Sequence, residues 1–415
     1  MDQHTVPSNS SDVKITDVQT TLLTGPCTND PFLLECRKRR SAAFIEVFTD
    51  SDLVGIGETY GGYYCPELVP ATVDLYKPIL IGRTVGNIEQ IWQDMYHCEN
   101  FWGRVGLGPI VLSGIDAALW DLKGKITGLP VYELLGGRKH DSLLGYATGG
   151  PSNYPKDRLA AKLDHYASLG FRAVKLGSGG LQDGRDIPLQ GIAAAVDFEA
   201  DKLQFVREHV GMDYAVLLDG HMGNRPGKVW DVAIAQAVMK AVEPFDLFLF
   251  EEPLHYTNPW GYAELCKSTT IPIAGGECLT GMYEWQVYVD RDCFDIGQPD
   301  AAFSGGPGTF MKIAAMLEGH RRQVATHSWG AGGGFMQNIH AGFAAANTVI
   351  LEIAPDYGPL HSEVIGDSFI FRDGMVYPPQ KPGLGIELTD ETRNRFPFVS
   401  GSGEYNNVPG KVMVE

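Results

Sequence analysis

Short apolar runs alternate with helical patterns from about residue 142 onward. The runs predict eight strands, at 142–149, 173–178, 215–220, 247–252, 272–277, 294–300, 323–328 and 348–354. Between them, apolar residues recur at helical spacing near 155–169, 190–210, 228–243, 258–268, 281–290, 304–319 and 333–346. Strands that alternate with helices in this way predict an α/β fold, a (β/α)8-type barrel. The glycine-rich stretch after the second run looks like an insertion with room for a further element.

The first 140 residues follow a different pattern. Strand-like runs at 13–23, 42–49 and 54–58 precede helical patterns near 66–80, 87–98 and 109–127. We therefore divide the chain into an N-terminal α+β domain (1–140), a barrel (141–370) and a C-terminal segment (371–415). That segment begins with a hairpin around Asp373-Gly374, and we expect it to return to the N-terminal domain.

Composition narrows the possible partners. The 415 residues include 51 acidic and 33 basic side chains, a net charge of −18 without any Lys/Arg-rich stretch. This argues against nucleic acid or an anionic membrane surface as partner. The seven cysteines are scattered and form no CxxC pair, so neither a disulfide framework nor a zinc site is indicated. The polar start lacks the regions of a secretory signal, and no run of 18 apolar residues exists, so we expect a cytoplasmic enzyme.

Three acidic residues stand where successive predicted strands end. Asp219 follows Tyr-Ala-Val-Leu-Leu, Glu251 follows Leu-Phe-Leu-Phe, and Glu277 follows Ile-Pro-Ile-Ala-Gly-Gly. Neighbouring barrel strands place these carboxylates side by side, where they repel one another unless a cation lies between them. The pattern predicts an all-oxygen site for a hard divalent metal, with Mg²⁺ as the first choice.

Other strand ends carry further polar candidates. In a barrel of this kind catalytic groups come from the C-terminal ends of the strands, and the candidates there are Lys175, His221, Glu252, Asp300, His327 and Glu352. Asp300 and His327 lie on neighbouring strands, and a carboxylate on one imidazole nitrogen fixes the tautomer and raises the basicity of the other. His221, two residues after Asp219 in an extended segment, is expected to face the mouth and lie across from His327. Glu252 is expected to point away from Glu251.

Each of these residues also has a structural interpretation. A strand-terminal acid often caps the next helix, a lone histidine at a strand end is more often structural than catalytic, and Lys175 is compatible with an ordinary lysine whose stem lies along apolar surface. A capping role for all three successive carboxylates is a much weaker explanation than a capping role for one.

Several motifs, in order along most of the chain, resemble the mandelate racemase/muconate lactonizing group of the enolase superfamily. They are Ser113-Gly-Ile-Asp-Ala-Ala-Leu-Trp-Asp-Leu-Lys-Gly-Lys with Leu129-Pro-Val-Tyr-Glu-Leu-Leu-Gly-Gly, Ala173-Val-Lys-Leu-Gly, Leu218-Asp-Gly-His, Phe250-Glu-Glu-Pro, Gly275-Gly-Glu-Cys, Gln298-Pro-Asp-Ala-Ala-Phe-Ser-Gly-Gly and Thr326-His-Ser. The resemblance implies that the N-terminal domain is a cap over a barrel that binds Mg²⁺. It also implies the chemistry of that superfamily, in which a Lys or His base acts together with Mg²⁺.

Carried over by position, the resemblance makes Asp219, Glu251 and Glu277 metal ligands. It makes Asp300 and His327 a catalytic dyad, Lys175 the first lysine of a Lys-x-Lys motif, and Glu352 an acid near the substrate carboxylate. The chain departs from the pattern at Gly177, where many relatives have the second lysine. It offers His221 instead, in an Asp-x-His arrangement similar to that of some sugar-acid dehydratases of the superfamily.

These observations predict a Mg²⁺-dependent sugar-acid dehydratase, a hydro-lyase that acts on a small molecule and is a homo-oligomer by resemblance. Alternatives within the superfamily are a racemase or epimerase and a lactone cycloisomerase. Outside it stand a barrel aldolase with Lys175 as Schiff base, and a binding or scaffold protein without activity. Candidate substrate contacts are Tyr60, Tyr63, Tyr64, Arg104, Asn224, Arg225, His255, Trp329 and Gln337.

Overall fold

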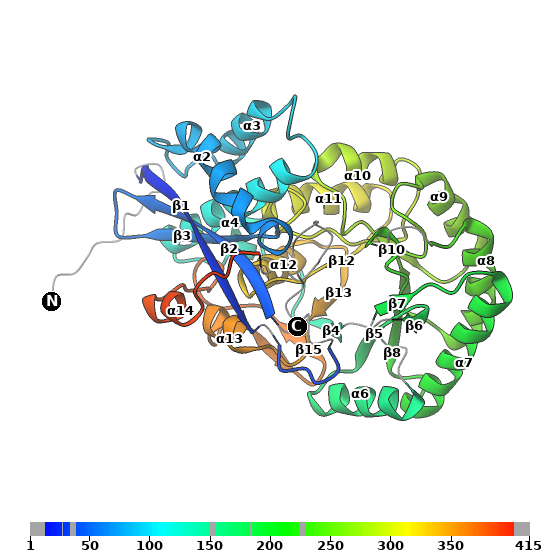
Figure 1. Ribbon diagram of the computed structural model, residues 1–415. Coiled ribbons are helices and arrows are strands. Elements are labelled where there is room, and N and C mark those ends of the chain that lie inside the picture. Colours follow the sequence, from blue (N-terminus) through cyan, green and yellow to red (C-terminus); the bar gives the residue numbers. More distant parts are fainter. Residues whose placement is uncertain are drawn as a thin grey trace.

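The structure is a computed structural model that describes residues 13–26, 28–33, 39–149, 155–182, 185–224 and 229–401. Its centre is a barrel of parallel strands in chain order, closed by pairing of the last strand with the first (Figure 1). The barrel strands in the described part of the chain are β4 (Leu143–Ala147), β5 (Ala173–Gly177), β8 (Ala215–Asp219), β9 (Leu249–Glu251), β10 (Ile273–Gly275), β11 (Ile296–Gly297), β12 (Gln323–Ala325) and β13 (Thr348–Ile353). The predicted (β/α)8-type barrel is confirmed.

Helices surround the barrel between successive strands (Figure 1). They are α6 (Lys156–Ser168), α7 (Ile192–Val210), α8 (Val232–Val242), α9 (Pro259–Ser268), α10 (Gly281–Val289), α11 (Pro307–Gly319) and α12 (Gly333–Ala344). Short 3-10 helices η3 (Met222–Asn224) and η4 (Glu243–Phe245) lie in the connections. The insertion after β5 holds a hairpin of β6 (Gly180–Gln182) and β7 (Arg185–Ile187), so the glycine-rich stretch does carry an extra element.

Side chains fill the interior of the barrel. Each strand contributes one residue to a buried cluster: Tyr146, Ala173, Leu217, Leu249, Ala274, Ile296, Ala325 and Ile350. Large and small residues are mixed around this layer, which lets side chains from opposite strands interdigitate. Because this layer is packed with buried side chains, the polar residues of the strands lie at the strand ends, beside the loops.

The N-terminal domain packs helices on an antiparallel sheet. The sheet consists of β1 (Ile15–Pro26), β2 (Arg39–Thr49) and β3 (Val54–Thr59), and its helices are α1 (Gly61–Tyr64), η2 (Pro66–Leu68), α2 (Val69–Leu80), α3 (Ile88–Cys98), α4 (Leu107–Thr127) and α5 (Val131–Leu134). The long α4 lies directly on β3 because β3 is glycine-rich. A Cβ at Gly57 would come within 2.2 Å of the Gly114 carbonyl oxygen, so only glycine permits this approach.

The C-terminal segment contacts both domains. It begins within β14 (Ile370–Arg372), which follows α13 (Pro359–Ile365) at the end of the barrel domain, and it contains β15 (Met375–Tyr377) and α14 (Asp390–Arg395). The hairpin of β14 and β15 is present where Asp373-Gly374 predicts it, but it pairs with β4 of the barrel. The chain after the hairpin is what reaches the N-terminal domain, through Leu384 N to Asp121 Oδ1 (2.7 Å) and Arg393 Nη2 to Glu46 Oε1 (2.7 Å).

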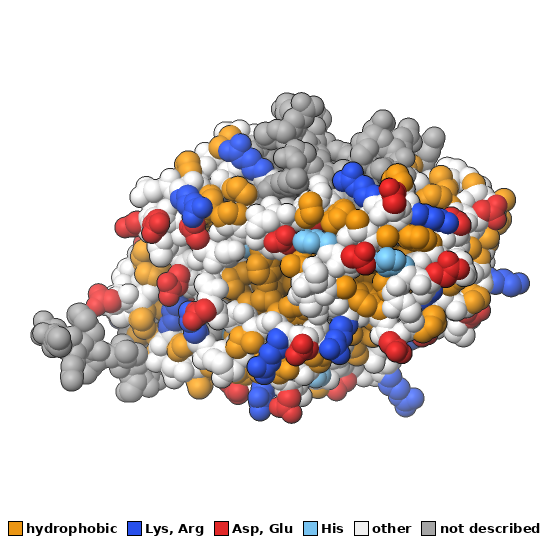
Figure 2. Space-filling model, turned by 90° about the horizontal axis from the view of Figure 1, so that it is seen from below, with side chains coloured by type: hydrophobic (Ala, Val, Ile, Leu, Met, Phe, Trp, Pro, Cys, Tyr) orange, Lys and Arg blue, Asp and Glu red, His pale blue; other side chains and the backbone are white. Residues whose placement is uncertain are grey.

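The surface carries charges of both signs. On the face drawn in Figure 2, acidic and basic side chains are interspersed among apolar ones, and the described residues there form no broad basic area. Within the described part of the chain, no helix combines the length and the apolar character that crossing a membrane demands.

Two buried histidines in the C-terminal half predict acid sensitivity. Burial lowers the pKa of His340 and of His361 to about 3, against about 6.5 for a free histidine. The folded pKa is depressed, so the unfolded chain binds more protons below pH 6.5 and stability falls as the pH drops from there. We expect a loss of about 1.4 kcal/mol per pH unit for each histidine.

Urea unfolding between pH 7 and pH 5 measures this loss. His361→Phe keeps a ring against Tyr357, which stacks on His361 at 5.9 Å between centroids, and is expected to remove one histidine's share of the slope. His97→Phe, at an exposed position, is the matched control substitution. Equal slopes for His361→Phe and the unaltered chain would contradict the assignment.

Candidate active site

The predicted polar residues all lie at one end of the barrel, at or just after the C-terminal ends of strands. Asp219 and Glu251 are the last residues of β8 and β9, and Glu277, Asp300 and His327 follow β10, β11 and β12. Lys175 and Glu352 lie within β5 and β13 near their ends. All seven are buried, with exposed fractions of 9% or less. Because the strands are parallel and the barrel is closed, these side chains share one mouth.

Lys175 connects three of the predicted acids. Its Nζ lies 2.6 Å from Glu251 Oε2, 3.1 Å from Glu352 Oε1 and 3.3 Å from Asp219 Oδ2. Burial lowers the pKa of Lys175, but the charges of Glu251 and Glu352 outweigh it and hold the pKa well above its usual value. Lys175 is therefore a fixed cation, which argues against a Schiff-base lysine, since that role requires a neutral amine.

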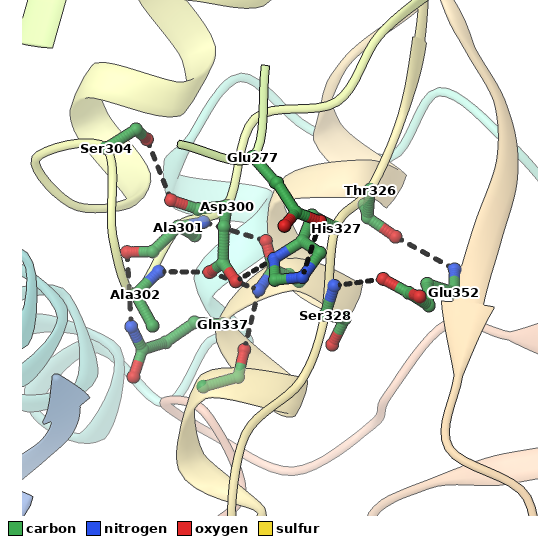
Figure 3. Close-up of polar contacts among 12 residues, drawn as sticks. Glu277, Asp300, Ala301, Ala302, Ser304, Thr326, His327, Ser328, Gln337 and Glu352 are labelled. Atoms are coloured by element: carbon green, nitrogen blue, oxygen red, sulfur yellow. Dashed lines mark hydrogen bonds and ion pairs between the residues drawn. The ribbon is translucent and has the colours of Figure 1, made fainter. Parts of the chain in front are cut away.

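His327 and Asp300 form the predicted dyad. His327 Nδ1 lies 2.8 Å from Asp300 Oδ2, and Ala302 N donates to Asp300 Oδ1 (2.7 Å) (Figure 3). Asn338 Nδ2 also donates to Asp300 Oδ1 (2.8 Å). These donors fix the carboxylate, which in turn orients the imidazole. Nδ1 is thus engaged and Nε2 faces the centre of the site, 3.3 Å from Glu277 Oε2.

His221 and His327 approach the same carboxylate. His221 Nε2 lies 3.5 Å from Glu277 Oε1, on the other oxygen from His327. For both rings burial lowers the pKa and neighbouring carboxylates outweigh it: Asp219 and Glu277 raise the pKa of His221 to about 9, and Glu277 and Asp300 raise that of His327 to about 10. The site thus holds two acid/base groups on either side of Glu277.

The backbone conformation that places His221 at the mouth differs from the prediction. The strand ends at Asp219, and His221 has a left-handed backbone (φ 51°) rather than an extended one. Its amide donates to Asp219 Oδ1 (2.9 Å), which closes a tight turn. Alternation along a strand is therefore the wrong explanation, although His221 does lie beside Glu277.

Glu252 lies just beyond β9, where its positive φ of 40° ends the extended backbone. Glu252 Oε2 accepts from Gly223 N (3.1 Å), and its carboxylate lies with that of Glu277 and the thiol of Cys278. Burial, with the charge of Glu277, raises the pKa of Glu252 to about 8. Sequence reasoning missed Cys278, because the scattered cysteines give no spacing motif.

The acids exceed the cations at this mouth, as a metal site requires. Six carboxylates (Asp219, Glu251, Glu252, Glu277, Asp300 and Glu352) face at most three positive side chains (Lys175, His221 and His327) among the described residues. Glu251 Oε1 is buried without a hydrogen-bond partner in the described part of the chain. An unsatisfied buried carboxylate oxygen in an acidic cluster fits a hard divalent cation.

The three predicted ligands are not equally close to one another. Lys175 lies between Asp219 and Glu251, and Glu277 contacts the two histidines. Among the residues that the structure describes, the ligand atoms that all lie within 4.8 Å belong to Glu252, Glu277 and Cys278. The set Asp219, Glu251 and Glu277 therefore stays a prediction for Mg²⁺.

The cap closes over the mouth. Tyr60, Tyr63 and Leu33 of the N-terminal domain pack with Trp329 and Ala302 of the barrel loops. The Tyr60 ring lies 5.7 Å from the His327 ring between centroids, which places it at the edge of the site. The cap therefore covers one side of the His327 ring and forms one wall of the mouth.

Other candidate contacts are structural or unplaced. Gln337 is fully buried and accepts a hydrogen bond from Glu58 N (2.8 Å), so it joins the cap to α12. Tyr63 is likewise fully buried, beside Arg40. Arg225 lies outside the described residues. At Gly177 the backbone oxygen accepts from Lys202 Nζ (2.6 Å), and without a Cβ the position supplies no base.

Comparison with known proteins decides the family. Residues 13–136 match the family model for the mandelate racemase / muconate lactonizing enzyme N-terminal domain, and residues 158–392 match that for the enolase C-terminal domain-like family. The chain belongs to the enolase superfamily.

Its relatives include enzymes of sugar acids and their lactones. The chain is 31% identical over 387 residues to a D-galactonate dehydratase family member from Streptomyces bingchenggensis, a match that covers 86% of this chain and 90% of the relative. It is 31% identical over 401 residues to a D-galactarolactone cycloisomerase from Agrobacterium fabrum, with 92% and 99% covered.

Solved structures of the superfamily share the fold over nearly the whole chain. The 3,6-anhydro-D-galactonate cycloisomerase from Zobellia galactanivorans matches with a TM-score of 0.78 at 28% identity, covering 92% of this chain and 99% of that one. A racemase from Streptomyces coelicolor with bound magnesium matches with a TM-score of 0.75 at 27% identity and the same coverage.

Proposed function

We propose that the protein is a Mg²⁺-dependent dehydratase that converts a sugar acid into a 2-keto-3-deoxy acid. The observation that carries the proposal is the pair of imidazoles, His327 and His221, on the two oxygens of Glu277. Dehydration needs a base for the proton alpha to the carboxylate and an acid for the departing hydroxyl. Two histidines around one small volume supply both, and the similarity to a D-galactonate dehydratase family member supports the same chemistry.

His327 is the proposed base. The carboxylates that raise the pKa of His327 favour its protonated form, and a cation bound among them would offset that effect and favour the neutral ring. Asp300 holds Nδ1 (2.8 Å), so in the neutral ring Nε2 carries the lone pair and faces the centre of the site. The cap residue Tyr60, next to this ring, limits the access of water. Removal of the alpha proton places negative charge on the substrate carboxylate, which is the costly part of the reaction.

Lys175 and, in its protonated form, Glu352 are proposed to donate hydrogen bonds to that carboxylate. Lys175 stays cationic among its acidic neighbours, and its hydrogen bonds to substrate oxygens strengthen as charge develops. Glu352 is fixed by Ser328 N, which donates to its Oε2 (2.6 Å). Mg²⁺, when bound by Asp219, Glu251 and Glu277, supplies Lewis-acid stabilisation of the charged carboxylate.

His221 is the proposed acid. It lies at the mouth with a partly exposed side chain (26%) and its Nε2 toward the site, so a protonated ring donates to the leaving hydroxyl. Loss of water leaves an enol, and the enol becomes the 2-keto-3-deoxy acid. His327 acts on the alpha carbon and His221 on the neighbouring carbon.

The test is a screen of mono- and diacid sugars with Mg²⁺, with keto-acid formation detected by semicarbazide. We expect one acid, or a few related acids, to yield one keto acid per molecule consumed. Chelation followed by gel filtration is expected to lower the rate by about a hundredfold or more, and added Mg²⁺ to restore it. Full activity after exhaustive chelation would contradict the metal-dependent mechanism.

Epimerisation is the second candidate, and the same two histidines favour it. A 1,1-proton transfer needs two bases, one for each face of the carbon, and His221 and His327, on the two oxygens of Glu277, are the candidates, since Gly177 supplies no lysine. Exchange of the alpha hydrogen with D₂O without keto acid would indicate this reaction. Consumption of a lactone without keto acid would instead indicate a cycloisomerase.

A further inference from the structure

A thiol lies among the carboxylates of the mouth. Within the described part of the chain, one ligand atom from each of Glu252, Glu277 and Cys278 lies within 4.8 Å of the other two. Glu252 comes from the end of β9, whereas Glu277 and Cys278 are consecutive residues in the turn after β10. Asp219, Glu251 and Lys175 form the other half of the mouth.

The turn after β10 explains why two consecutive residues face one point. Gly276 has a positive φ of 114°, and Leu279 N donates to its carbonyl oxygen (3.1 Å). A Cβ at Gly276 would come within 2.3 Å of the Trp285 ring, so the turn is held against α10. In an extended strand Glu277 and Cys278 would point to opposite sides; this turn brings both toward Glu252.

The buried carboxylate of Glu252 is a second, independent indication that a ligand binds here. The residue has an exposed fraction of only 1%, and one carboxylate oxygen accepts from Gly223 N. The other oxygen, Oε1, is buried and has no hydrogen-bond partner among the described residues. The polar groups around this carboxylate include Glu277, His221 and the thiol of Cys278, which donates toward Glu252; a metal ion would take the place of that thiol proton. A buried carboxylate oxygen of this kind needs a cation or a donor.

We propose that Glu252, Glu277 and Cys278 form a second cation site, selective for a thiophilic divalent ion of the zinc class. Sulfur is a poor ligand for Mg²⁺ and a preferred one for Zn²⁺, Cd²⁺ and Co²⁺, so the thiol separates this site from the all-oxygen one. Three protein ligands leave the fourth position of a tetrahedral ion for water. Cys278 is partly exposed, whereas Glu252 and Glu277 are buried.

The two cation sites share Glu277. An ion held by Glu252, Glu277 and Cys278 takes a carboxylate that the proposed Mg²⁺ site needs and that both histidines contact. We therefore infer that a thiophilic ion inhibits the enzyme in competition with Mg²⁺; this consequence, unlike the site itself, rests on the proposed function.

Cobalt titration tests the site without substrate. Co²⁺ added to the metal-free full-length protein is expected to produce a sulfur-to-cobalt charge-transfer band that saturates at one ion, and Zn²⁺ is expected to abolish it. Cys278→Ser is expected to lose the band and to weaken Zn²⁺ binding at least about tenfold. Cys98→Ser, which alters an exposed free cysteine on the cap, is the matched control that keeps both.

Alkylation of the unaltered protein gives a second measurement that no folding defect can disturb. Zn²⁺, but not Mg²⁺, is expected to protect Cys278 from iodoacetamide, as read by peptide mass spectrometry. Absence of the cobalt band, its persistence in Cys278→Ser, or equal alkylation with and without Zn²⁺ would overturn the proposal. Since none of these measurements involves turnover, their failure leaves the dehydratase proposal standing, and failure of the sugar-acid screen leaves the cation site standing.

Discussion

His327→Asn is expected to lower the turnover of the sugar acid about 10³-fold and to abolish exchange of the alpha hydrogen with D₂O. The asparagine amide lacks the basic nitrogen that His327 presents at Nε2, and no other imidazole in the described site has the support of Asp300. NMR detection of deuterium incorporation measures exchange, and isothermal titration with Mg²⁺ measures metal binding. Metal affinity is expected to stay within about threefold, because none of the three predicted Mg²⁺ ligands is altered.

Two further variants make this result specific. His320→Asn removes an exposed histidine at the end of α11 and is expected to leave exchange unchanged. Asp300→Asn keeps the shape of the dyad and removes its charge, so we expect a loss of about 10- to 100-fold in kcat with little change in KM. Full exchange in His327→Asn would remove His327 from the role of base, and His221 would then be the residue to test.

Glu58→Ala is expected to destabilise the protein by about 3–5 kcal/mol, the largest effect on stability that we predict. Glu58 lies near the end of β3 in the cap, enclosed against the loop that follows His327, with an exposed fraction of 1%. Its carboxylate accepts hydrogen bonds from Ala331 N (2.9 Å to Oε1) and Gly334 N (2.7 Å to Oε2). Alanine leaves both amides buried without an acceptor, since the cap covers them.

Glu58→Gln, which keeps the shape of the side chain without its charge, shows how much of the stability depends on the charge. Burial raises the pKa of Glu58 against the opposing effect of the Gly334 and Ala331 amides and of Arg40, so the charge itself is costly. Glu58→Gln keeps one acceptor oxygen and is expected to lose less than half as much stability as Glu58→Ala. Urea unfolding measures both, and hydrogen exchange at the Ala331 and Gly334 amides is expected to rise in Glu58→Ala.

A control at the surface completes the comparison. Glu133→Ala, at an exposed position of α5, is expected to change stability by less than about 0.5 kcal/mol. If Glu58→Ala unfolds at the same urea concentration as Glu133→Ala, the cap and the loop after β12 are not joined by this carboxylate. A loss of stability without faster amide exchange at Ala331 would place the effect elsewhere in the cap.

The barrel and the polar residues at its mouth could be predicted from the local sequence pattern. Apolar runs such as Tyr-Ala-Val-Leu-Leu before Asp219 are long enough to form buried strands, and an acid at the end of such a run has to leave the core. Parallel strands in sequence order then bring consecutive ends together. For that reason Asp300 and His327 were paired correctly from sequence, and their bond of 2.8 Å depends on little more than strand adjacency.

Local pattern was insufficient where the chain leaves the strands. The period of two that describes a strand stops at its last residue, and His221 (φ 51°) and Glu252 (φ 40°) both have left-handed backbones just beyond it. The side chains there take their direction from turns that are closed by contacts with other segments, such as Gly223 N on Glu252. Periodicity therefore could not say which carboxylate faces which cation.

By itself the sequence determined which residues stand at the mouth: a hydrophobic core forces each strand to be apolar, so charges collect where strands end. Only the tertiary structure decided how those charges pair, for example that Lys175 lies between Asp219 and Glu251 while Cys278 joins Glu252. It also decided that Glu58 of the cap fixes the loop after His327, through a hydrogen bond between residues 273 positions apart. Pairing of this kind depends on distances between segments that no local pattern encodes, because each partner is supplied by a different part of the folded chain.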